Sequence, residues 1–238
     1  MILDIDIGNT RTKWLIHRVG EFDDQAVAAV ATANLTSVGE WDQYPIERVR
    51  ISSVVNSGVK GIVQWSEGRG IKPELAAVRD GVAGVTCGYR RPEQLGIDRW
   101  LAMLAAREFV REDCLVVSAG TAVTLDVLLC TGRHLGGFIL PGLAAMSASL
   151  NRSTAGIDTN RVETPTLQPG LATPEAVWNG ALLALVASVE KAACLHRVSR
   201  IIVTGGDGPR LAEHLVNCNV AVQCLPHLVL RGLSVALP

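Results

Sequence analysis

The chain has 238 residues, with 22 basic and 23 acidic side chains, and 48% of its residues are hydrophobic. This length holds one large domain or two small ones, and the balanced charge provides no surface that attracts polyanions. We therefore expect no nucleic-acid partner; zinc-finger spacing and aromatic-basic RNA motifs are also missing from the sequence. Aromatic residues make up only 4%, so an aliphatic core of sheets covered by helices is expected.

The six cysteines and five histidines show no CxxC pair and no metal-ligand spacing. Cysteines inside apolar runs such as VLLC and AACL are typical of reduced, buried thiols. Met1 leads directly into a strand without a signal-peptide pattern, and polar residues interrupt the longest apolar stretch, 114–130. These features predict a cytoplasmic protein that has no membrane partner.

In chain order, the hydrophobic pattern alternates between the period of strands and that of helices. Strands are predicted at 1–8 with a hairpin partner at 12–22, at 49–55, at 113–129 as a second strand–turn–strand unit, and near 134, 200 and 221. Helices are predicted at 56–68, 95–110, after the Pro-Gly at 141–142, at 175–198, at 209–218 and at the C-terminus. The run 26–35 fits a strand or a helix, and 152–174 is a polar loop suited to a functional or interface role.

Two segments share one layout, DIDIGNTRTK at 4–13 and VSAGTAVTLD at 117–126. A shift of 112 positions places Gly8 on Gly120 and Asp6 on Ser118. This repeat suggests two related halves, 1–112 and 113–238. Two unrelated strand turns would explain the pattern about as well, because Gly and Thr are common at strand ends.

The first of these segments has the residue types of a phosphate-binding turn. Gly8 permits close approach of a ligand, and exposed amides with the Asn9 and Thr10 side chains can surround phosphate oxygens. Asp6 is placed to hold Mg²⁺ through water, and Lys13 can reach a phosphate. A polar β-turn capped by Asn is the alternative. Neither GxxxxGK[ST] nor GxGxxG occurs in the chain.

Five motifs, DIDIGNTRTK, LGIDRWLAMLAA, GTAVTLD, LGGFILPG and VTGGD, occur in the order and spacing of type III pantothenate kinases. The resemblance spans almost the whole chain. It implies an α/β fold of the actin-like superfamily, with two ribonuclease-H-like domains built of mixed sheets flanked by helices. It also implies ATP-dependent phosphorylation of pantothenate to 4′-phosphopantothenate, the first step of coenzyme A biosynthesis, by a homodimer whose pantothenate pocket lies at the subunit interface.

The resemblance also assigns roles to individual residues. It implies ATP binding by Asp6, Ile7, Gly8, Asn9, Thr10, Arg11, Thr12, Lys13 and Thr121, with Asp6 at Mg²⁺. It implies pantothenate binding by Tyr89, Gly96, Ile97, Asp98, Arg99 and Thr173, with Asp98 as the proton acceptor. From the residues alone, Asp98 is equally suited to cap a helix, and Arg99 to be a solvated helix residue. Tyr89 could likewise be a boundary aromatic, and Thr173 an N-cap before Pro174.

Ser118 departs from the resemblance, because family members usually carry an aspartate there that helps bind a monovalent cation, typically K⁺. A hydroxyl brings no formal charge, so we expect weaker K⁺ or NH₄⁺ binding, or no dependence on these ions. Asp126 lies too far along the strand to be assigned as a substitute. His134, His196 and His227 lack partner patterns and are interpreted as structural.

Two other functions remain open from the sequence. One is a non-catalytic, gene-expression accessory member of the same family, which is disfavoured by the intact Asp6, Lys13, Asp98 and Arg99. The other is a different small-molecule kinase or ATPase of the superfamily, which the LGIDR segment disfavours, because shared ATP-binding hairpins do not require it.

Overall fold

The computed structural model describes residues 1–35, 39–55, 58–153, 160–215 and 220–238. The chain forms two compact units. The first unit contains Met1–Phe109, Thr131–Arg133 and His227–Pro238, and the second contains Val110–Cys130 and His134–Pro226. Each unit has a mixed five-stranded sheet with helices beside it, which confirms the predicted α/β fold class.

The first unit is built on a sheet of order β3-β2-β1-β4-β5. Its strands are β1 (Ile2–Ile7), β2 (Arg11–His17), β3 (Ala28–Ala31), β4 (Arg48–Ser53) and β5 (Glu74–Leu75). The pairs β1–β2 and β2–β3 are antiparallel, whereas β1–β4 and β4–β5 are parallel. The run 26–35, whose sequence fits a strand or a helix, forms β3 followed by a short 3-10 helix (Thr32–Asn34).

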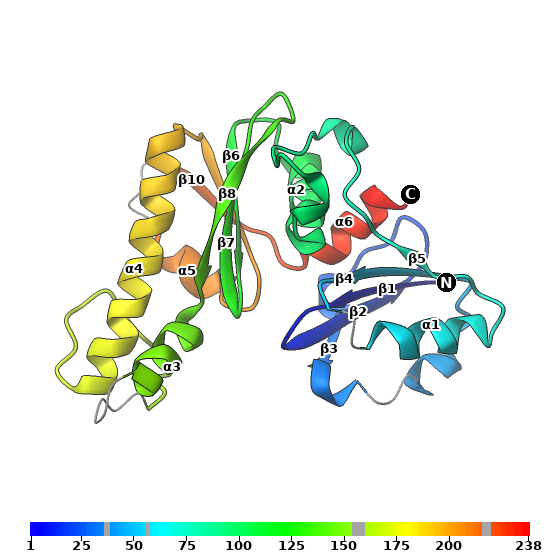
Figure 1. Ribbon diagram of the computed structural model, residues 1–238, viewed down its shortest axis with the longest axis horizontal. Coiled ribbons are helices and arrows are strands. Elements are labelled where there is room, and N and C mark those ends of the chain that lie inside the picture. Colours follow the sequence, from blue (N-terminus) through cyan, green and yellow to red (C-terminus); the bar gives the residue numbers. More distant parts are fainter. Residues whose placement is uncertain (36–38, 56–57, 154–159, 216–219) are drawn as a thin grey trace. The chain divides into compact units, whose positions relative to one another are not determined.

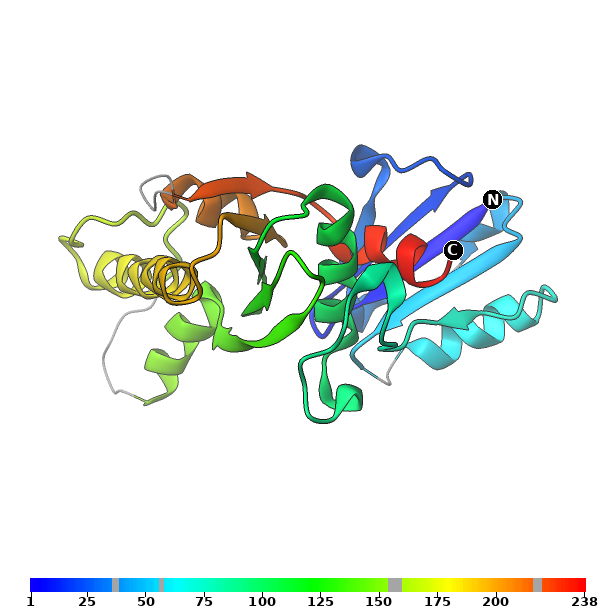
Figure 2. The same cartoon turned by 90° about the horizontal axis from the view of Figure 1, so that it is seen from above.

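Helices cover both faces of this first sheet. Figure 1 shows α1 (Val59–Glu67) on one side, and α2 (Ile97–Phe109) with α6 (Leu228–Ala236) on the other. In Figure 2, α6 (red) lies over the blue strands, in agreement with its contacts to β1 and β4. Short 3-10 helices, Asp24–Ala26, Gly39–Gln43, Val82–Gly84 and Pro92–Gln94, lie in the connections.

The two faces of the first sheet differ in polarity because β1 alternates apolar and acidic residues. Leu3, Ile5 and Ile7 point to the α1 side, where they join a core that includes Trp14 and Trp41. The opposite face carries Asp4 and Asp6. We call it the polar face; it also includes Lys13, His17, Arg50 and Ser52, which the strand register places on the same side.

A buried polar cluster on this face ties the end of the chain to the first sheet. Arg50 donates two hydrogen bonds to Asp4, at 2.6 and 2.7 Å, and His17 Nε2 lies 3.0 Å from Asp4 Oδ2. Arg50 Nη1 also donates to the carbonyl of Leu237 at 2.8 Å. The C-terminal residues therefore pack with the first unit, although they follow the second unit in sequence.

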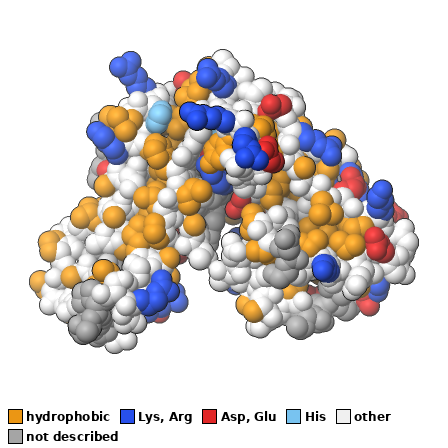
Figure 3. All heavy atoms as spheres, in the orientation of Figure 1, with side chains coloured by type: hydrophobic (Ala, Val, Ile, Leu, Met, Phe, Trp, Pro, Cys, Tyr) orange, Lys and Arg blue, Asp and Glu red, His pale blue; other side chains and the backbone are white. Residues whose placement is uncertain are grey.

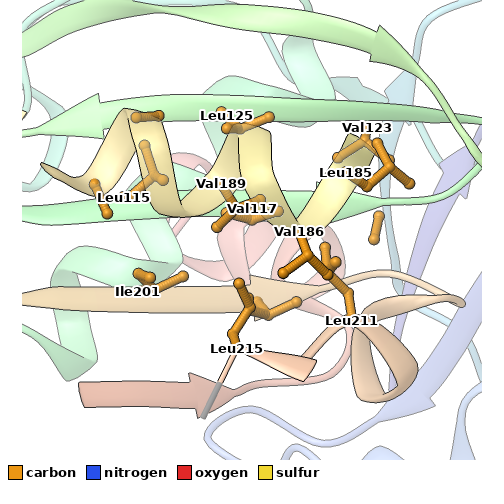
Figure 4. Close-up of a cluster of buried hydrophobic side chains, with 14 of the residues drawn as sticks. Leu115, Val117, Val123, Leu125, Leu185, Val186, Val189, Ile201, Leu211 and Leu215 are labelled. Carbon is orange, nitrogen blue, oxygen red and sulfur yellow. The ribbon is translucent and has the colours of Figure 1, made fainter. Parts of the chain in front are cut away.

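The second unit has a sheet of order β10-β9-β6-β7-β8. Its strands are β6 (Cys114–Ala119), β7 (Ala122–Leu128), β8 (His134–Pro141), β9 (Arg200–Thr204) and β10 (Ala221–Cys224), and its helices are α3 (Leu143–Ser153), α4 (Thr173–His196) and α5 (Gly208–His214). Figure 4 shows the core between this sheet and α4, with Leu115, Val117 and Leu125 from the strands facing Leu185 and Val189.

Helix α4 is long and apolar enough, by length and composition, to cross a membrane. The same properties are expected of a core helix, and residues such as Leu182, Val186 and Val189 are buried against the second sheet. The helix therefore gives weak support for a membrane span. Among the described residues it is the one helix that passes this test.

Candidate functional site

Asp6 occupies the centre of a transverse row on the polar face of the first sheet. Its neighbour on β2 is Lys13 and its neighbour on β4 is Ser52, both directly opposite in register. The Ser52 hydroxyl donates a hydrogen bond of 3.1 Å to Asp6 Oδ1. Burial raises the pKa of Asp6 to about 6, aided by the charge of Asp98 and opposed by Ser52 and Lys13.

The turn between β1 and β2 presents exposed polar residues next to Asp6. Asn9, Thr10 and Arg11 are exposed, and Gly8 is tightly placed, since a Cβ there would lie 2.9 Å from the Arg11 carbonyl oxygen. Ile7 and Thr12 are fully buried, main chain included.

Thr32, which the sequence did not single out, holds this turn from the 3-10 helix that follows β3. Its hydroxyl donates to the Gly8 carbonyl at 2.8 Å, and its amide donates to the Thr10 carbonyl at 2.9 Å. A lone threonine after a short apolar run carries no sequence pattern that marks such a role. The turn is therefore stabilised by a residue from outside the hairpin.

The first turn of α2 brings Asp98 toward Asp6. Gly96 precedes the helix, and a Cβ at Gly96 would lie only 2.6 Å from Asp98 Oδ1. The Arg99 amide donates to that same oxygen at 2.9 Å, and a carboxylate is favoured at this positive helix end. Asp98 is near enough for its charge to raise the pKa of Asp6, second only to burial. The structure thus places the predicted base and the predicted metal ligand on one side of one unit.

Tyr89 and Arg99, both predicted to bind pantothenate, contact each other directly. Arg99 Nη1 donates to the Tyr89 hydroxyl at 2.6 Å, and the guanidinium carbon lies 5.4 Å from the centre of the Tyr89 ring. Arg99 is only 4% exposed, so it is not a solvated helix residue. Tyr89 therefore fixes the position of a buried cation beside Asp98.

In the second unit, three of the sequence motifs meet at the β6–β7 turn. The Gly142 amide donates to the Thr121 carbonyl at 2.9 Å, and the Asp207 amide donates to the Ala119 carbonyl at 3.1 Å. Gly205 has φ +95°, and a Cβ there would lie 2.1 Å from the Ala119 carbonyl oxygen. Thr121 itself is exposed. The GTAVT, LPG and VTGGD segments therefore form one closely packed turn region.

Ser118 lies in a row of hydroxyl groups on the second sheet. Its register neighbours are Thr124 on β7 and Thr204 on β9. Thr124 Oγ1 is buried and has no hydrogen-bond partner among the described residues. Asp126 is also buried, and its Oδ1 lies 2.9 Å from His134 Nε2. Asp126, the acidic residue on β7 that lies nearest to Thr124 in sequence, is therefore already in contact with His134.

Thr173 begins α4 and lines a groove between α3 and α4. The groove has a volume of about 820 Å³, and its lining includes Met146, Leu150, Leu171 and Gly180. The N-cap position belongs to Ala172, so Thr173 does not fill it. Leu171 is 97% exposed at the rim. Thr173 is thus an exposed polar residue beside a groove of the second unit.

The charged groups near Asp6 fit Mg²⁺ better than a metal that needs many protein ligands. No group of three or more His, Cys, Asp or Glu side chains suited to a metal occurs within the described ranges. Mg²⁺ is commonly held by one or two carboxylates, with water and substrate phosphates supplying the other oxygens. Asp6 and Asp98 provide two carboxylates whose mutual repulsion a cation would relieve.

Comparison with known proteins gives a consistent result over almost the whole length. The sequence model of one family, described as type III pantothenate kinase, matches residues 2–194. The type III pantothenate kinase of Nitrosococcus oceani is 36% identical over 253 aligned positions, which cover 98% of this chain and 92% of the relative. That of Acinetobacter baumannii is 35% identical and covers 97% of this chain and 94% of the relative.

Solved structures support the fold. A Campylobacter jejuni protein assigned by name to the Baf family of transcriptional activators gives a TM-score of 0.61 at 23% identity, covering 97% of this chain and 94% of that one. A ROK family glucokinase from Streptomyces griseus, in complex with glucose and AMPPNP, gives 0.51 at 13% identity, covering 98% and 97%. At these identities the likeness concerns the fold alone.

Proposed function

Because this chain belongs to the type III pantothenate kinase family, we propose that the polar face of its first sheet is where ATP-dependent phosphorylation of pantothenate takes place. The reaction transfers the γ-phosphoryl group of ATP to an alcohol of pantothenate and gives 4′-phosphopantothenate, the first step toward coenzyme A. The observation that carries the assignment to this face is the proximity of Asp6, Lys13 and Asp98 within one unit.

In this proposal the first turn and Lys13 hold the ATP phosphates. The exposed side chains of Asn9, Thr10 and Arg11, with main-chain amides of the turn, surround phosphate oxygens, and Lys13 supplies a positive charge. Asp6 would hold Mg²⁺ through water. The ion, when bound, neutralises the charge that develops on the transferred group. Thr121, which is exposed, is also proposed as a contact for ATP.

Asp98 would accept the proton of the pantothenate hydroxyl as that oxygen attacks the γ-phosphorus. Its Oδ1 is fixed by the Arg99 amide, and Gly96 leaves room beside it. Arg99 offers its guanidinium to the carboxylate of pantothenate, in an orientation that Tyr89 maintains. Gly96 and Ile97 would complete this end of the pocket through their main chain and the start of α2.

We propose that a second copy of the chain packs on the exposed side of α4. That side presents Ala176, Gly180, Ala184 and Ala187 at helical spacing, with Leu183 54% exposed among them. Small residues allow close packing, and Figure 3 shows hydrophobic side chains at the surface of this part of the chain. Thr173 at the groove beside α4 would then contact pantothenate near the subunit boundary.

Size-exclusion chromatography with light scattering tests the dimer. Ala184→Arg should shift the native protein toward the monomer, because a charged side chain on this side of α4 would have to be buried. Ala29→Arg, at an exposed position on β3, is the matched control and should leave the mass unchanged. A wild-type protein that is monomeric at micromolar concentration would refute the dimer.

We also propose that the enzyme does not strictly require a monovalent cation. The position occupied by Ser118 is flanked by two threonine hydroxyls, and the buried Asp126 is engaged by His134. A K⁺ or NH₄⁺ ion there would meet neutral oxygens only, so its binding should be weak. We further propose that residues 1–112 and 113–238 are the two duplicated halves of the fold, with the last residues of the second half, His227–Pro238, packing in the first unit.

The regulatory alternative predicts binding of nucleic acid, which the charge distribution does not favour. Lys and Arg side chains are interspersed with acidic and uncharged ones over the face in Figure 3, and the chain carries a formal net charge of −1. We therefore propose a cytoplasmic enzyme without nucleic-acid or membrane partners.

A coupled assay of ADP formation with pantothenate, ATP and Mg²⁺, with and without K⁺ or NH₄⁺, tests the main proposal. We expect pantothenate-dependent turnover in every salt, with mass spectrometry identifying 4′-phosphopantothenate. Sugars and other small alcohols as acceptors test the alternative of a different kinase. Folded protein that gives no turnover with pantothenate in any salt would contradict the proposed function.

A further inference from the structure

Two acidic residues of β1 lie next to each other on the polar face but have different partners on β4. Asp4 stands opposite Arg50, and Asp6 stands opposite Ser52, two residues further along both strands. Arg50 donates two hydrogen bonds to Asp4, which is fully buried, and so balances its charge. Asp4 is therefore committed to the folded structure.

Ser52 holds the second carboxylate by different means. It is fully buried, and its hydroxyl donates to Asp6 Oδ1 at 3.1 Å. A hydroxyl can fix the orientation of a carboxylate, but it adds no positive charge. Ser52 therefore fixes the Asp6 carboxylate without adding to the positive charge of Lys13 on β2, in a place where an arginine such as Arg50 would have neutralised it.

We propose that Ser52 is a positioning residue that holds the Asp6 carboxylate in the orientation in which it binds the metal–nucleotide complex. This inference rests on the proposed role of Asp6 at Mg²⁺. The simplest competing explanation is that Ser52 only satisfies its own buried hydroxyl. The two explanations differ in one respect: a positioning residue affects nucleotide binding only when the metal is present.

The experiment compares three variants of the full-length protein. Ser52→Ala removes the donor, and Ser52→Cys keeps a side chain of similar size with a weak donor. Ser53→Ala is the matched control, because Ser53 is the next residue of β4, points to the other face and bonds the Val55 carbonyl at 2.5 Å. Calorimetry measures the Kd of ATP with Mg²⁺ and with EDTA, and assays give KM for pantothenate and the Mg²⁺ concentration for half-maximal rate.

We expect Ser52→Ala to raise the Kd of ATP with Mg²⁺, and the Mg²⁺ concentration for half-maximal rate, by about tenfold, the usual scale for a lost hydrogen bond to a charged group. Ser52→Cys should lie between Ser52→Ala and the wild type. The Kd of ATP in EDTA and the KM for pantothenate should stay within about twofold, as should all values for Ser53→Ala.

Equal losses with Mg²⁺ and with EDTA, or the same losses in Ser53→Ala, would show that Ser52 has only a structural role and would overturn the inference. No change in either Ser52 variant would overturn it as well. Failure of the proposed function is distinguishable, because it would appear as wild-type protein that binds ATP with Mg²⁺ but does not turn over pantothenate. The calorimetric comparison still decides the role of Ser52 in that case.

Discussion

The carboxylates of Asp6 on β1 and Asp98 on α2 lie close enough to repel each other across the polar face. Burial raises the pKa of Asp6 to about 6, and the charge of Asp98 is the next largest cause. Such a pair is costly in the absence of a cation, and a bound Mg²⁺ would offset the repulsion. This repulsion couples the proposed metal ligand, Asp6, to the proposed base, Asp98. It supports different roles for the two carboxylates, one at the metal ion and one as proton acceptor.

Replacing Asp98 by asparagine should lower kcat by about 10²- to 10⁴-fold, the range for loss of a general base. ATP binding should persist, because the proposed contacts to the nucleotide come from Asp6, Lys13 and the turn between β1 and β2. Steady-state kinetics and calorimetry measure the two quantities. Glu93→Gln, an exposed carboxylate five positions earlier, is the control and should behave as the wild type. Unchanged kcat in Asp98→Asn would refute the base assignment.

Replacing Tyr89 by phenylalanine should raise the KM for pantothenate by about tenfold, because Arg99 loses a hydrogen bond that fixes its guanidinium. The change in kcat should be smaller, since Asp98 keeps its own contact with the Arg99 amide. Tyr44→Phe, at a side chain that is 43% exposed, is the control. If Tyr89→Phe had an unchanged KM, Arg99 would not depend on Tyr89 for substrate binding.

Replacing Ser118 by aspartate should create activation by K⁺, because a carboxylate would then join the hydroxyls of Thr124 and Thr204. The measurement is turnover as a function of KCl at constant ionic strength, with a bulky organic cation as the balancing salt. Ser118→Asn, which has similar size and no charge, should show the salt response of the wild type. A wild-type enzyme that is inactive without K⁺ would contradict the proposal.

Replacing Gly205 by alanine should destabilise the protein by about 3–5 kcal/mol, because the new Cβ would overlap the Ala119 carbonyl and φ is +95°. Gly206→Ala is the matched control, since no atom lies within 4 Å of a Cβ there. Urea unfolding followed by circular dichroism measures both. Equal stability of the two variants would mean that the turn rearranges freely.

His17 should make folding stability depend on pH. The hydrogen bond from His17 to Asp4 is the largest cause that raises its pKa above 6.5. A raised pKa means that this contribution to the free energy of unfolding is complete below pH 6.5 and is lost as pH rises through the folded-state pKa. Urea unfolding of the wild type and of His17→Asn at several pH values should show a steeper decline for the wild type. His214→Asn controls for loss of a histidine, and parallel curves for wild type and His17→Asn would refute the prediction.

Much of the fold follows from local patterns that the sequence shows directly. The alternation of Leu3, Asp4, Ile5 and Asp6 predicts a strand with one apolar and one acidic face, and the spacing in 95–110 predicts α2. The long apolar run that forms α4 is also recognisable by its length. These features depend on neighbours within a few residues, so they can be predicted without the tertiary structure.

Only some residues of the site can be predicted from such local patterns. The sequence indicates Asp6, Lys13 and Asp98 as functional residues, but Ser52 and Thr32 lack a motif and are found only through their contacts. The polar Ser52-Ser53 pair at the end of a buried strand is the one signal that could have drawn attention to β4.

The sequence by itself determined the family, the order of the strands and helices apart from β3 and β5, and the acidic face of β1. Only the tertiary structure decided that Asp4 pairs with Arg50 while Asp6 pairs with Ser52, and that α6 returns to the first sheet. The physical reason is that strand register and helix docking join residues far apart in the chain, and local sequence periodicity does not encode these long-range pairings. That difference between two neighbouring aspartates is what leaves Asp6 available for a cation.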